Sequence, residues 1–232
     1  MAAIRTARDR ARAELTREIK GEARRQLGEV GANGLSLRAV ARELGMVSSA
    51  LYRYFPSRDH LLTELIVDAY NAIGEAAENA DPGPGTAPRR RWLDIWRAVR
   101  GWARQHPHEY ALIYGSPVPG YRAPEDTIAP AARVATALLR VAGSGPLTPA
   151  HPGPPLPPEL EEQASRLAAG LGADHSAADM ARLLITWTQL FGAIGFELFG
   201  QYVNVVEPAD AFFDYLAASM ADLVGLPDDG TD

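Results

Sequence analysis

The residues from Ser36 to Phe55 constrain this chain most, because they form two short helical patterns separated by a glycine. Ser36 is a residue type that caps helix starts, and apolar residues follow it at helical spacing. These are Val40, Ala41 and Leu44. Gly45 can adopt the positive φ that ends a helix. A second apolar stripe then consists of Ala50, Leu51, Tyr54 and Phe55. The pattern predicts a helix-turn-helix.

The second helix of a helix-turn-helix enters the major groove of DNA, and the residues near its start meet the base edges. We therefore expect Ser48, Ser49 and Arg53 to contact bases. Tyr52 is placed to donate to a phosphate, and Arg38 on the first helix can reach either kind of group. The alternative is that these are ordinary solvated residues of a small helical hairpin.

The flanking segments complete a three-helix unit. Upstream, an apolar residue at every fourth position predicts a long helix, with Ala11, Leu15, Ile19, Ala23 and Leu27. Downstream, Pro56 ends the second helix and Ser57 can cap another. Arg58 falls on the first turn of that helix, where free amides attract anions, and is predicted to clamp a phosphate. The helix continues to residue 80 and is a candidate lever.

The segment Leu51–Leu62 resembles the DNA-binding domain of TetR-type regulators over roughly residues 10 to 65. The resemblance rests on a Leu-Tyr-x-x-Phe core, a Pro-Ser-basic turn and a Leu-Leu pair at the spacing of that family. It implies an all-α chain with a helix-turn-helix domain (1–56), a connecting helix (57–80) and a helical ligand-binding and dimerisation domain (81–232). Val47 stands where the family commonly has serine or another polar residue, so a side-chain cap is expected to be lost there.

The charge of the chain is divided between its two parts. Residues 1–60 have a balance of +5, whereas the remainder has a balance of −11. A basic head on an acidic body concentrates the attraction for nucleic acid at one end. Arginines that precede or open the first helix can lie along the DNA backbone or reach into a minor groove, the alternative being a solvated terminus. These are Arg5, Arg8, Arg10 and Arg12.

Other classes of function find little support in the residues. The chain has no cysteine, which excludes disulfides and thiolate metal sites. The sequence also shows neither clustered metal ligands nor a glycine-rich phosphate loop after a strand, so we expect no cofactor and no metal. His106-Pro107-His108 is interpreted as helix punctuation and Asp174-His175-Ser176 as a helix start, and we expect no enzyme activity. The absence of an apolar run of about 18 residues and of a signal sequence predicts a cytoplasmic protein with no membrane partner.

The rest of the chain is predicted to be helical, and no segment alternates with period two. A turn-rich connector covers 81–88, and seven prolines between Ser144 and Pro158 predict a long loop. The predicted helices are 88–105, 107–114, 125–142, 158–171, 176–200 and 207–225.

The last two helices are apolar on most sides, which predicts a subunit interface. In TetR-type proteins these helices pair with their symmetry mates in a four-helix bundle. The interface candidates are Leu190, Ile194, Phe199, Phe212, Phe213, Leu216 and Met220. The alternative is that both helices close the core of the monomer.

The C-terminal part also resembles, more loosely, a TetR subgroup named for a Trp-His-Gly signature, with Phe191 in place of the histidine. Aromatic residues crowd this part, which suits an apolar or aromatic small molecule. The candidate ligand-binding residues are Trp96, Tyr110, Tyr114, Trp187, Gln189 and Phe191. We expect a homodimeric regulator, usually a repressor, that leaves a palindromic double-stranded operator when this effector binds. The alternatives are a DNA-binding regulator without a ligand and a small-molecule-binding or catalytic helical protein that no longer uses its DNA-binding fold.

Overall fold

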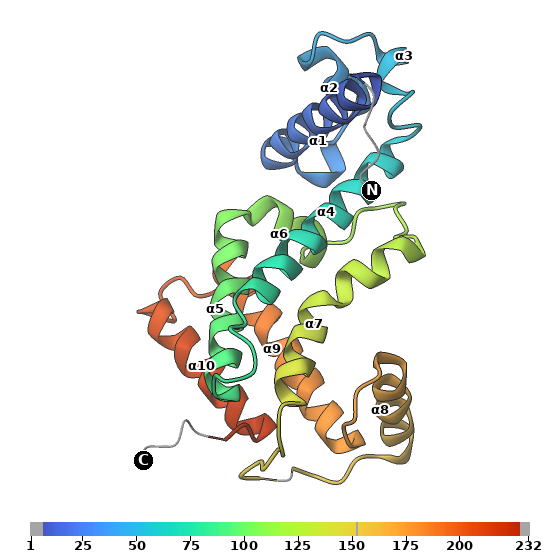
Figure 1. Ribbon diagram of the computed structural model, residues 1–232. Helices are drawn as coiled ribbons and strands as arrows, with labels where there is room; N and C mark the ends of the chain where they lie inside the picture. Colours follow the sequence, from blue (N-terminus) through green and yellow to red (C-terminus); the bar gives the residue numbers. More distant parts are fainter. Residues whose placement is uncertain (1–6, 152, 228–232) are drawn as a thin grey trace. The chain divides into compact units, whose positions relative to one another are not determined.

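The computed structural model describes residues 7–151 and 153–227, and these form ten α-helices and one 3₁₀-helix with no β-strand (Figure 1). The all-α expectation is therefore confirmed. In order, the elements are α1 (Ala7–Gly34), α2 (Leu37–Glu43), α3 (Ser48–Leu51), α4 (Arg58–Asn79), α5 (Pro88–Gln105), α6 (Pro107–Tyr114), η1 (Glu125–Thr127), α7 (Ile128–Ala142), α8 (Pro158–Leu171), α9 (Ala177–Leu198) and α10 (Ala209–Val224). No helix in this part of the chain is both long enough and apolar enough to cross a membrane.

The chain divides into two compact units, and helix α4 contributes to both. The first unit extends to Tyr70 and also includes His106–Ile128, whereas the second holds Asn71–Gln105 and the chain from Ala129 onward. This division differs from the one expected from the sequence, which assigned all of 81–232 to the second part. The reason is that α6 and the segment after it pack on the helix-turn-helix unit rather than on the C-terminal helices.

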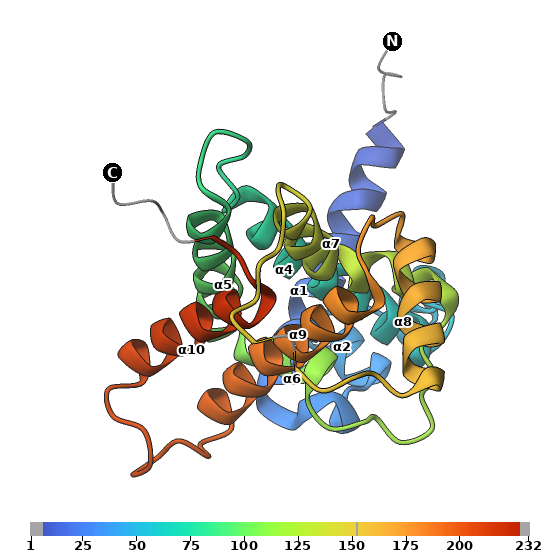
Figure 2. The same ribbon diagram turned by 90° about the horizontal axis from the view of Figure 1, so that it is seen from below.

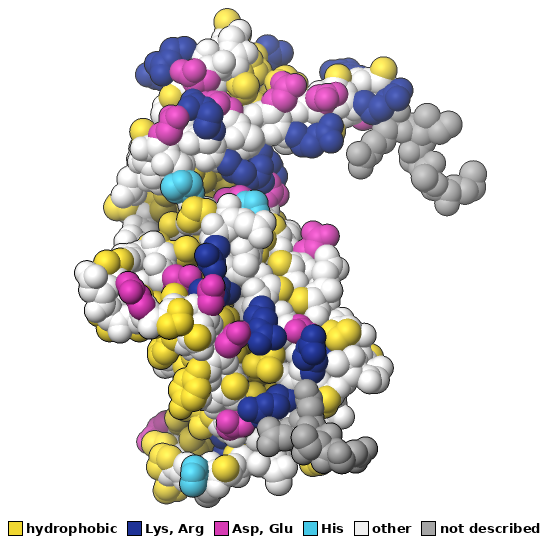
Figure 3. All heavy atoms as spheres, turned by 90° about the vertical axis from the view of Figure 1, so that its left-hand side faces the viewer, with side chains coloured by type: hydrophobic (Ala, Val, Ile, Leu, Met, Phe, Trp, Pro, Cys, Tyr) yellow, Lys and Arg dark blue, Asp and Glu magenta, His cyan; other side chains and the backbone are white. Residues whose placement is uncertain are grey.

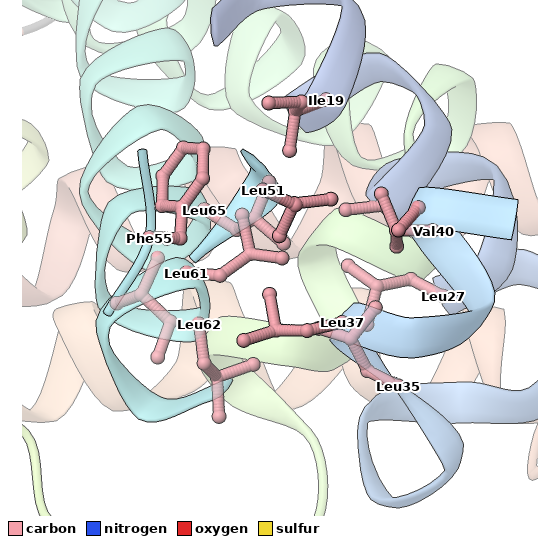
Figure 4. Close-up of a cluster of buried hydrophobic side chains, with 13 residues drawn as sticks. Ile19, Leu27, Leu35, Leu37, Val40, Leu51, Phe55, Leu61, Leu62 and Leu65 are labelled. Atoms are coloured by element: carbon pink, nitrogen blue, oxygen red, sulfur yellow. The ribbon is translucent and has the colours of Figure 1, made fainter. Parts of the chain in front are cut away.

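A single apolar core holds the first unit together (Figure 4). Ile19 of α1, Leu51 of α3 and Leu61 of α4 point toward one another and are fully buried. Leu112 and Ile113 of α6 pack against the same core. The core thus uses most of the apolar stripes that the sequence predicted, and it fixes α3 from its inner side. Ala11, predicted to belong to the first stripe, is exposed instead, because it lies near the start of α1, beyond the residues that pack in the core.

The turn between α2 and α3 has the geometry expected from Gly45. This glycine has φ 64°, its N–H donates to the Arg42 carbonyl at 3.1 Å, and the N–H of Met46 donates to the Ala41 carbonyl at 2.8 Å. These two bonds form a Schellman motif, which satisfies the last carbonyls of α2 and reverses the chain. A β-carbon at this position would be strained by the positive φ.

Ion pairs and hydrogen bonds attach the His106–Ile128 segment to the rest of the first unit. Arg24 on α1 donates to Asp68 of α4 at 2.6 Å and to Glu109 of α6 at 3.0 Å. The hydroxyl groups of Thr63 and Tyr121 lie 2.9 Å apart, within hydrogen-bond distance. Arg24 therefore links three helices within this unit.

In the second unit, α5 packs against α9 and α10 through an apolar face around a buried charge. Trp92, Trp96 and Val99 of α5 are fully buried. Arg100 follows on the same face and donates to Glu197 of α9 at 2.7 and 2.8 Å. It also pairs with Asp210 of α10 at 2.7 Å.

Most helix boundaries follow from local sequence signals. The predicted ranges 88–105, 107–114 and 158–171 coincide with α5, α6 and α8. Ser176 and Asp179 form a capping box at the start of α9, because each side chain accepts a hydrogen bond from the backbone N–H of the other residue. The proline-rich stretch contains no regular structure in its described residues before Pro158, where α8 begins. The N–H of Thr148 in that stretch donates to the carbonyl of Gly225 at 2.8 Å.

Candidate nucleic-acid interface

Helix α3 presents one face to the core and another to solvent. Leu51 is fully buried, whereas Ser49 and Arg53 are exposed and Tyr52 is 42 % exposed. Ser48 is half-buried at the first position of the helix. On α2, the side chain of Arg38 is also exposed. The residues predicted to meet DNA thus lie on accessible positions of the motif, and their contacts with bases and phosphates stay predictions.

The caps of these helices agree only partly with the sequence signals. Val47 occupies the N-cap position of α3 and is 69 % exposed, and it supplies no side-chain cap, as expected. Ser57 does cap α4, because its hydroxyl accepts a hydrogen bond from the N–H of His60 at 3.1 Å. The expected cap by Ser36 is wrong: this residue stands at the N-cap of α2, but its side chain makes no cap bond.

Arg58, which its position predicted to clamp a phosphate, makes hydrogen bonds within the first unit, and its contact with a phosphate stays a prediction. Its Nε donates to the carbonyl of Leu35 at 3.1 Å, and its Nη2 donates to the carbonyl of Ala32 at 2.7 Å. These carbonyls follow the kink of α1 at Gly31, where φ is 68°. Through these bonds Arg58 ties the start of α4 to the end of α1, while its Nη1 lies 3.6 Å from the carboxylate of Asp59.

The residues expected to bind a ligand fall into both units. Tyr110 and Tyr114 lie in the first unit, where their rings are 5.2 Å apart and Tyr70 meets Tyr114 edge-on at 5.9 Å. Burial raises the pKa of both Tyr110 and Tyr114. These phenols are therefore neutral at physiological pH.

The other candidates belong to the second unit. Trp96 is fully buried, with its ring 5.9 Å from those of Trp92 and Phe213. Trp187 and Phe191 form an edge-on pair at 5.6 Å. Gln189 is exposed, so the predicted polar group of the pocket faces solvent instead of the aromatic side chains.

Two buried indole N–H groups in the second unit have no hydrogen-bond acceptor within the described residues. Their nitrogens are the Nε1 atoms of Trp96 and Trp187. By contrast, Nε1 of Trp92 donates to the carbonyl of Ala217 at 3.3 Å. Because a buried N–H without a partner costs free energy, an acceptor group at either indole would be stabilising. Sequence could identify the tryptophans but had no signal for which N–H would stay unpaired.

A hollow of about 620 Å³ lies elsewhere in the second unit, and none of the predicted ligand-binding residues lines it. It is bordered by the end of α7, the start of the proline-rich stretch and the turn before α9. Arg140, Asp174, His175 and Asp179 give it a polar lining. Its chemistry differs from the aromatic pocket that the sequence predicted.

The predicted subunit interface needs correction at three positions. Leu190 and Ile194 are fully buried and Phe213 is 3 % exposed, so these residues form the core of the monomer and are not available to a partner. Phe213 packs on Trp96 and lies under the guanidinium of Arg100, whose Cζ is 4.8 Å from its ring centroid. Leu216 and Met220 are half-buried. The sequence pattern predicted that both sides of these helices are apolar. Only the packing of the protomer shows which side is buried within the chain and which side is exposed.

The opposite side of α9 and α10 exposes large apolar side chains. Phe199 is 46 % exposed and Phe212 is 37 % exposed, so these two predicted interface residues are accessible. Phe196 of α9 and Tyr215 of α10 are 55 and 72 % exposed, and Val203 and Val205 of the turn between the two helices are 67 and 75 % exposed. The ring of Tyr202 lies 5.9 Å from Phe196 and 5.6 Å from Phe212. We call this set, Phe196–Val205 with Phe212 and Tyr215, the aromatic ridge.

Comparison with known proteins identifies the family. The N-terminal residues 21–65 match the model of bacterial regulatory proteins of the tetR family, and residues 92–220 match the tetracyclin repressor-like C-terminal domain. The chain belongs to the TetR family. This TetR-family chain is therefore a DNA-binding transcriptional regulator, as its resemblance implied. Its family and relatives are regulators and not enzymes.

Similar proteins span nearly the whole TetR-family chain. The HTH-type transcriptional regulator Rv1816 of Mycobacterium tuberculosis is 43 % identical over 201 residues, which cover 83 % of this chain and 84 % of that protein. The regulator Mb1846 of Mycobacterium bovis gives the same values. The structure of the regulatory protein SCO4313 is 31 % identical, with a TM-score of 0.76 over 93 % of this chain and 98 % of the other. PfmR from Thermus thermophilus, at 18 % identity, shares the fold with a TM-score of 0.56 over 89 and 96 % of the two chains.

Proposed function

We propose that this regulator binds a palindromic operator as a homodimer, represses transcription there, and is released by an apolar or aromatic small molecule. The accessible polar face of the helix-turn-helix carries the DNA-binding part of the proposal. Arg53, Ser49 and Tyr52 extend from a segment whose inner residue, Leu51, is fixed in the core. Such preorganisation lets arginine and serine side chains read base edges without first ordering the backbone.

The aromatic ridge supports the homodimer. Exposed aromatic side chains gathered on one surface mark protein–protein contacts more often than free surface. A two-fold axis through this ridge would pair α9 and α10 with their copies in the partner. Two-fold symmetry in turn requires an operator of two inverted half-sites, with centres about 34–36 Å apart or a multiple of that distance.

The unpaired indoles support a small-molecule effector and narrow its chemistry. An effector that combines an apolar or aromatic body with an oxygen or nitrogen acceptor would complete the hydrogen bonding of Trp96 or Trp187. Binding must also weaken the operator complex by the same factor by which the operator weakens effector binding.

The experiment is to select operator fragments from genomic DNA with the purified protein and to measure the affinity for the selected duplex. Loss of the Arg53 side chain in Arg53→Ala should weaken the selected duplex by about 10–100-fold relative to a scrambled one, as expected for a base contact. Arg166→Ala, which removes an exposed arginine of α8, is the matched control and should leave this ratio unchanged. An equal loss on both duplexes in Arg53→Ala would show that this residue does not read bases.

A regulator without a small-molecule effector is the second candidate. It is favoured by the complete burial of Trp96 and Tyr110, which is typical of filled cores. The two candidates separate in a titration of tryptophan fluorescence with aromatic compounds, with and without operator. A compound with the same affinity for the protein in the presence and absence of operator would not regulate DNA binding, and this result would favour the second candidate.

A further inference from the structure

The first turns of α1 carry a basic face that the core of the first unit does not use. Further along the helix, Ile19 is fully buried and Leu15 is half-buried. At about 100° per residue, Arg12 and Arg8 point within about 20° of the direction of Ile19. One stripe of α1 therefore changes from apolar to basic toward the start of the helix, which extends away from α2 (Figure 2).

A ring contact places this basic stripe beside the recognition segment. The guanidinium carbon of Arg12 lies 5.2 Å from the ring centroid of Tyr54, which is a cation–π distance. Tyr54 belongs to the turn directly after α3, and its N–H donates to the carbonyl of Leu51 at 2.8 Å. Arg12 is thus held near the segment predicted to enter the major groove. Arg8 lies one turn further out, about 6 Å along the helix axis.

Neither arginine has an acidic partner in the described part of the chain, and both side chains are exposed. Arg10 and Arg17 lie on the opposite face, and Arg17 approaches Glu14 at 4.0 Å. On this part of the first unit, Lys and Arg side chains recur with Asp and Glu among them (Figure 3). The amino end of α1 adds the positive end of the helix dipole to the same region. A partner with closely spaced negative charges fits this face, and duplex DNA has one charge per about 1.7 Å of axis.

We propose that Arg8 and Arg12 form a second DNA contact, with the phosphates of the duplex that flanks the major-groove site of α3. The backbone is helical from Ala7 onward, so these side chains meet the sugar–phosphate backbone from a rigid helix and do not enter a minor groove as an extended arm. Such a contact strengthens binding to all sequences and carries no base specificity. It extends the DNA-binding function proposed above.

The test is a salt titration of DNA affinity with two double variants of equal charge. Arg8→Gln/Arg12→Gln should reduce the slope of log K against log salt by about 0.9 for each phosphate that is no longer neutralised, and it should weaken binding about fivefold for each such phosphate near 0.15 M salt. The loss of affinity should be the same on selected and scrambled duplexes. Arg10→Gln/Arg17→Gln removes the same charge from the opposite face and should change the slope much less.

The remaining outcomes are distinguishable. Equal reductions of the slope in the two double variants would overturn the proposal, because they would reflect net charge alone. The single variant Arg8→Gln leaves the Arg12–Tyr54 cation–π pair in place and should still reduce the slope of log K against log salt in part. A reduced slope in this variant therefore does not result from misfolding caused by loss of that pair. Wild-type protein that binds no duplex in a salt-dependent manner would instead refute the proposed function. Wild-type binding that is unaffected by Arg8→Gln/Arg12→Gln would refute only this inference.

Discussion

Substitution by glutamate should have different effects at two residues of the same helix, Ile194 and Phe196. Ile194 is fully buried in the core of the second unit, whereas Phe196 is 55 % exposed on the aromatic ridge. They are about 200° apart around α9. Phe196→Glu should therefore give a folded protein that no longer dimerises, whereas Ile194→Glu should prevent folding.

The expected magnitude follows from the exposed area. A phenylalanine buries roughly 200 Å² when fully covered, so the exposed 55 % of Phe196 amounts to about 110 Å². At about 25 cal/mol per Å², covering it contributes about 3 kcal/mol per protomer, or nearly 6 kcal/mol in a symmetric dimer. Losing that contribution raises the dimer dissociation constant about 10⁴-fold, and a carboxylate placed against apolar groups adds a desolvation cost.

Sedimentation velocity and circular dichroism separate the two effects. The Phe196→Glu variant should sediment as a monomer with a cooperative thermal transition, and Phe196→Ala should show a smaller shift in the same direction. The Ile194→Glu variant should lose the cooperative transition, because an unpaired buried charge costs several kcal/mol. A Phe196→Glu protein that is still dimeric at micromolar concentration would refute the assignment of the aromatic ridge as the interface.

Three further predictions concern stability. Two hydrogen bonds from Arg91, at 2.6 and 2.8 Å, lower the pKa of Asp81, so the free energy of unfolding should fall as the pH decreases below about 4. The Asp81→Asn variant should lack this pH dependence. In urea titrations at neutral pH, its free energy of unfolding should be about 3–5 kcal/mol lower than that of the wild type. Val47→Ser should supply the missing N-cap of α3 and raise the free energy of unfolding by about 0.5–2 kcal/mol, and an unchanged denaturation midpoint would contradict this. Trp92→Phe should destabilise the protein about 0.5–1.5 kcal/mol more than Trp96→Phe, because only the former removes a hydrogen bond, from Nε1 to the Ala217 carbonyl. Equal losses in calorimetry would show that the Trp96 N–H also has a partner.

Local signals were sufficient to predict most of the secondary structure. Prolines at the first turns of α5, α6 and α8, the capping box of α9 and the glycine after α2 act within a few residues, so their effect can be read without knowing the fold. The helix-turn-helix is encoded in the same way, by two apolar stripes and a positive-φ glycine in one short segment. For that reason the family resemblance was also strongest there.

The roles of long polar side chains could not be predicted from the sequence. Arg58 stands where a helix start attracts anions, yet it reaches back to carbonyls more than twenty residues earlier in the chain. Arg12, expected only as one member of a basic terminus, is fixed against the ring of Tyr54. The partner of a flexible cation depends on which acceptors the fold brings within about 3 Å, and sequence spacing does not encode that distance.

The sequence by itself determined that this chain is helical, that it has a DNA-reading motif, and that its last two helices are apolar almost all round, because periodicity and capping are properties of neighbouring residues. Tertiary structure decided which side of those helices is core: Leu190, Ile194 and Phe213 face inward, and Phe196, Phe199 and Phe212 do not. It also decided that α6 packs with the helix-turn-helix unit. Burying an apolar side chain gives the same transfer free energy whether its own chain or a partner subunit covers it. Only the packing of distant segments therefore distinguishes a core residue from an interface residue.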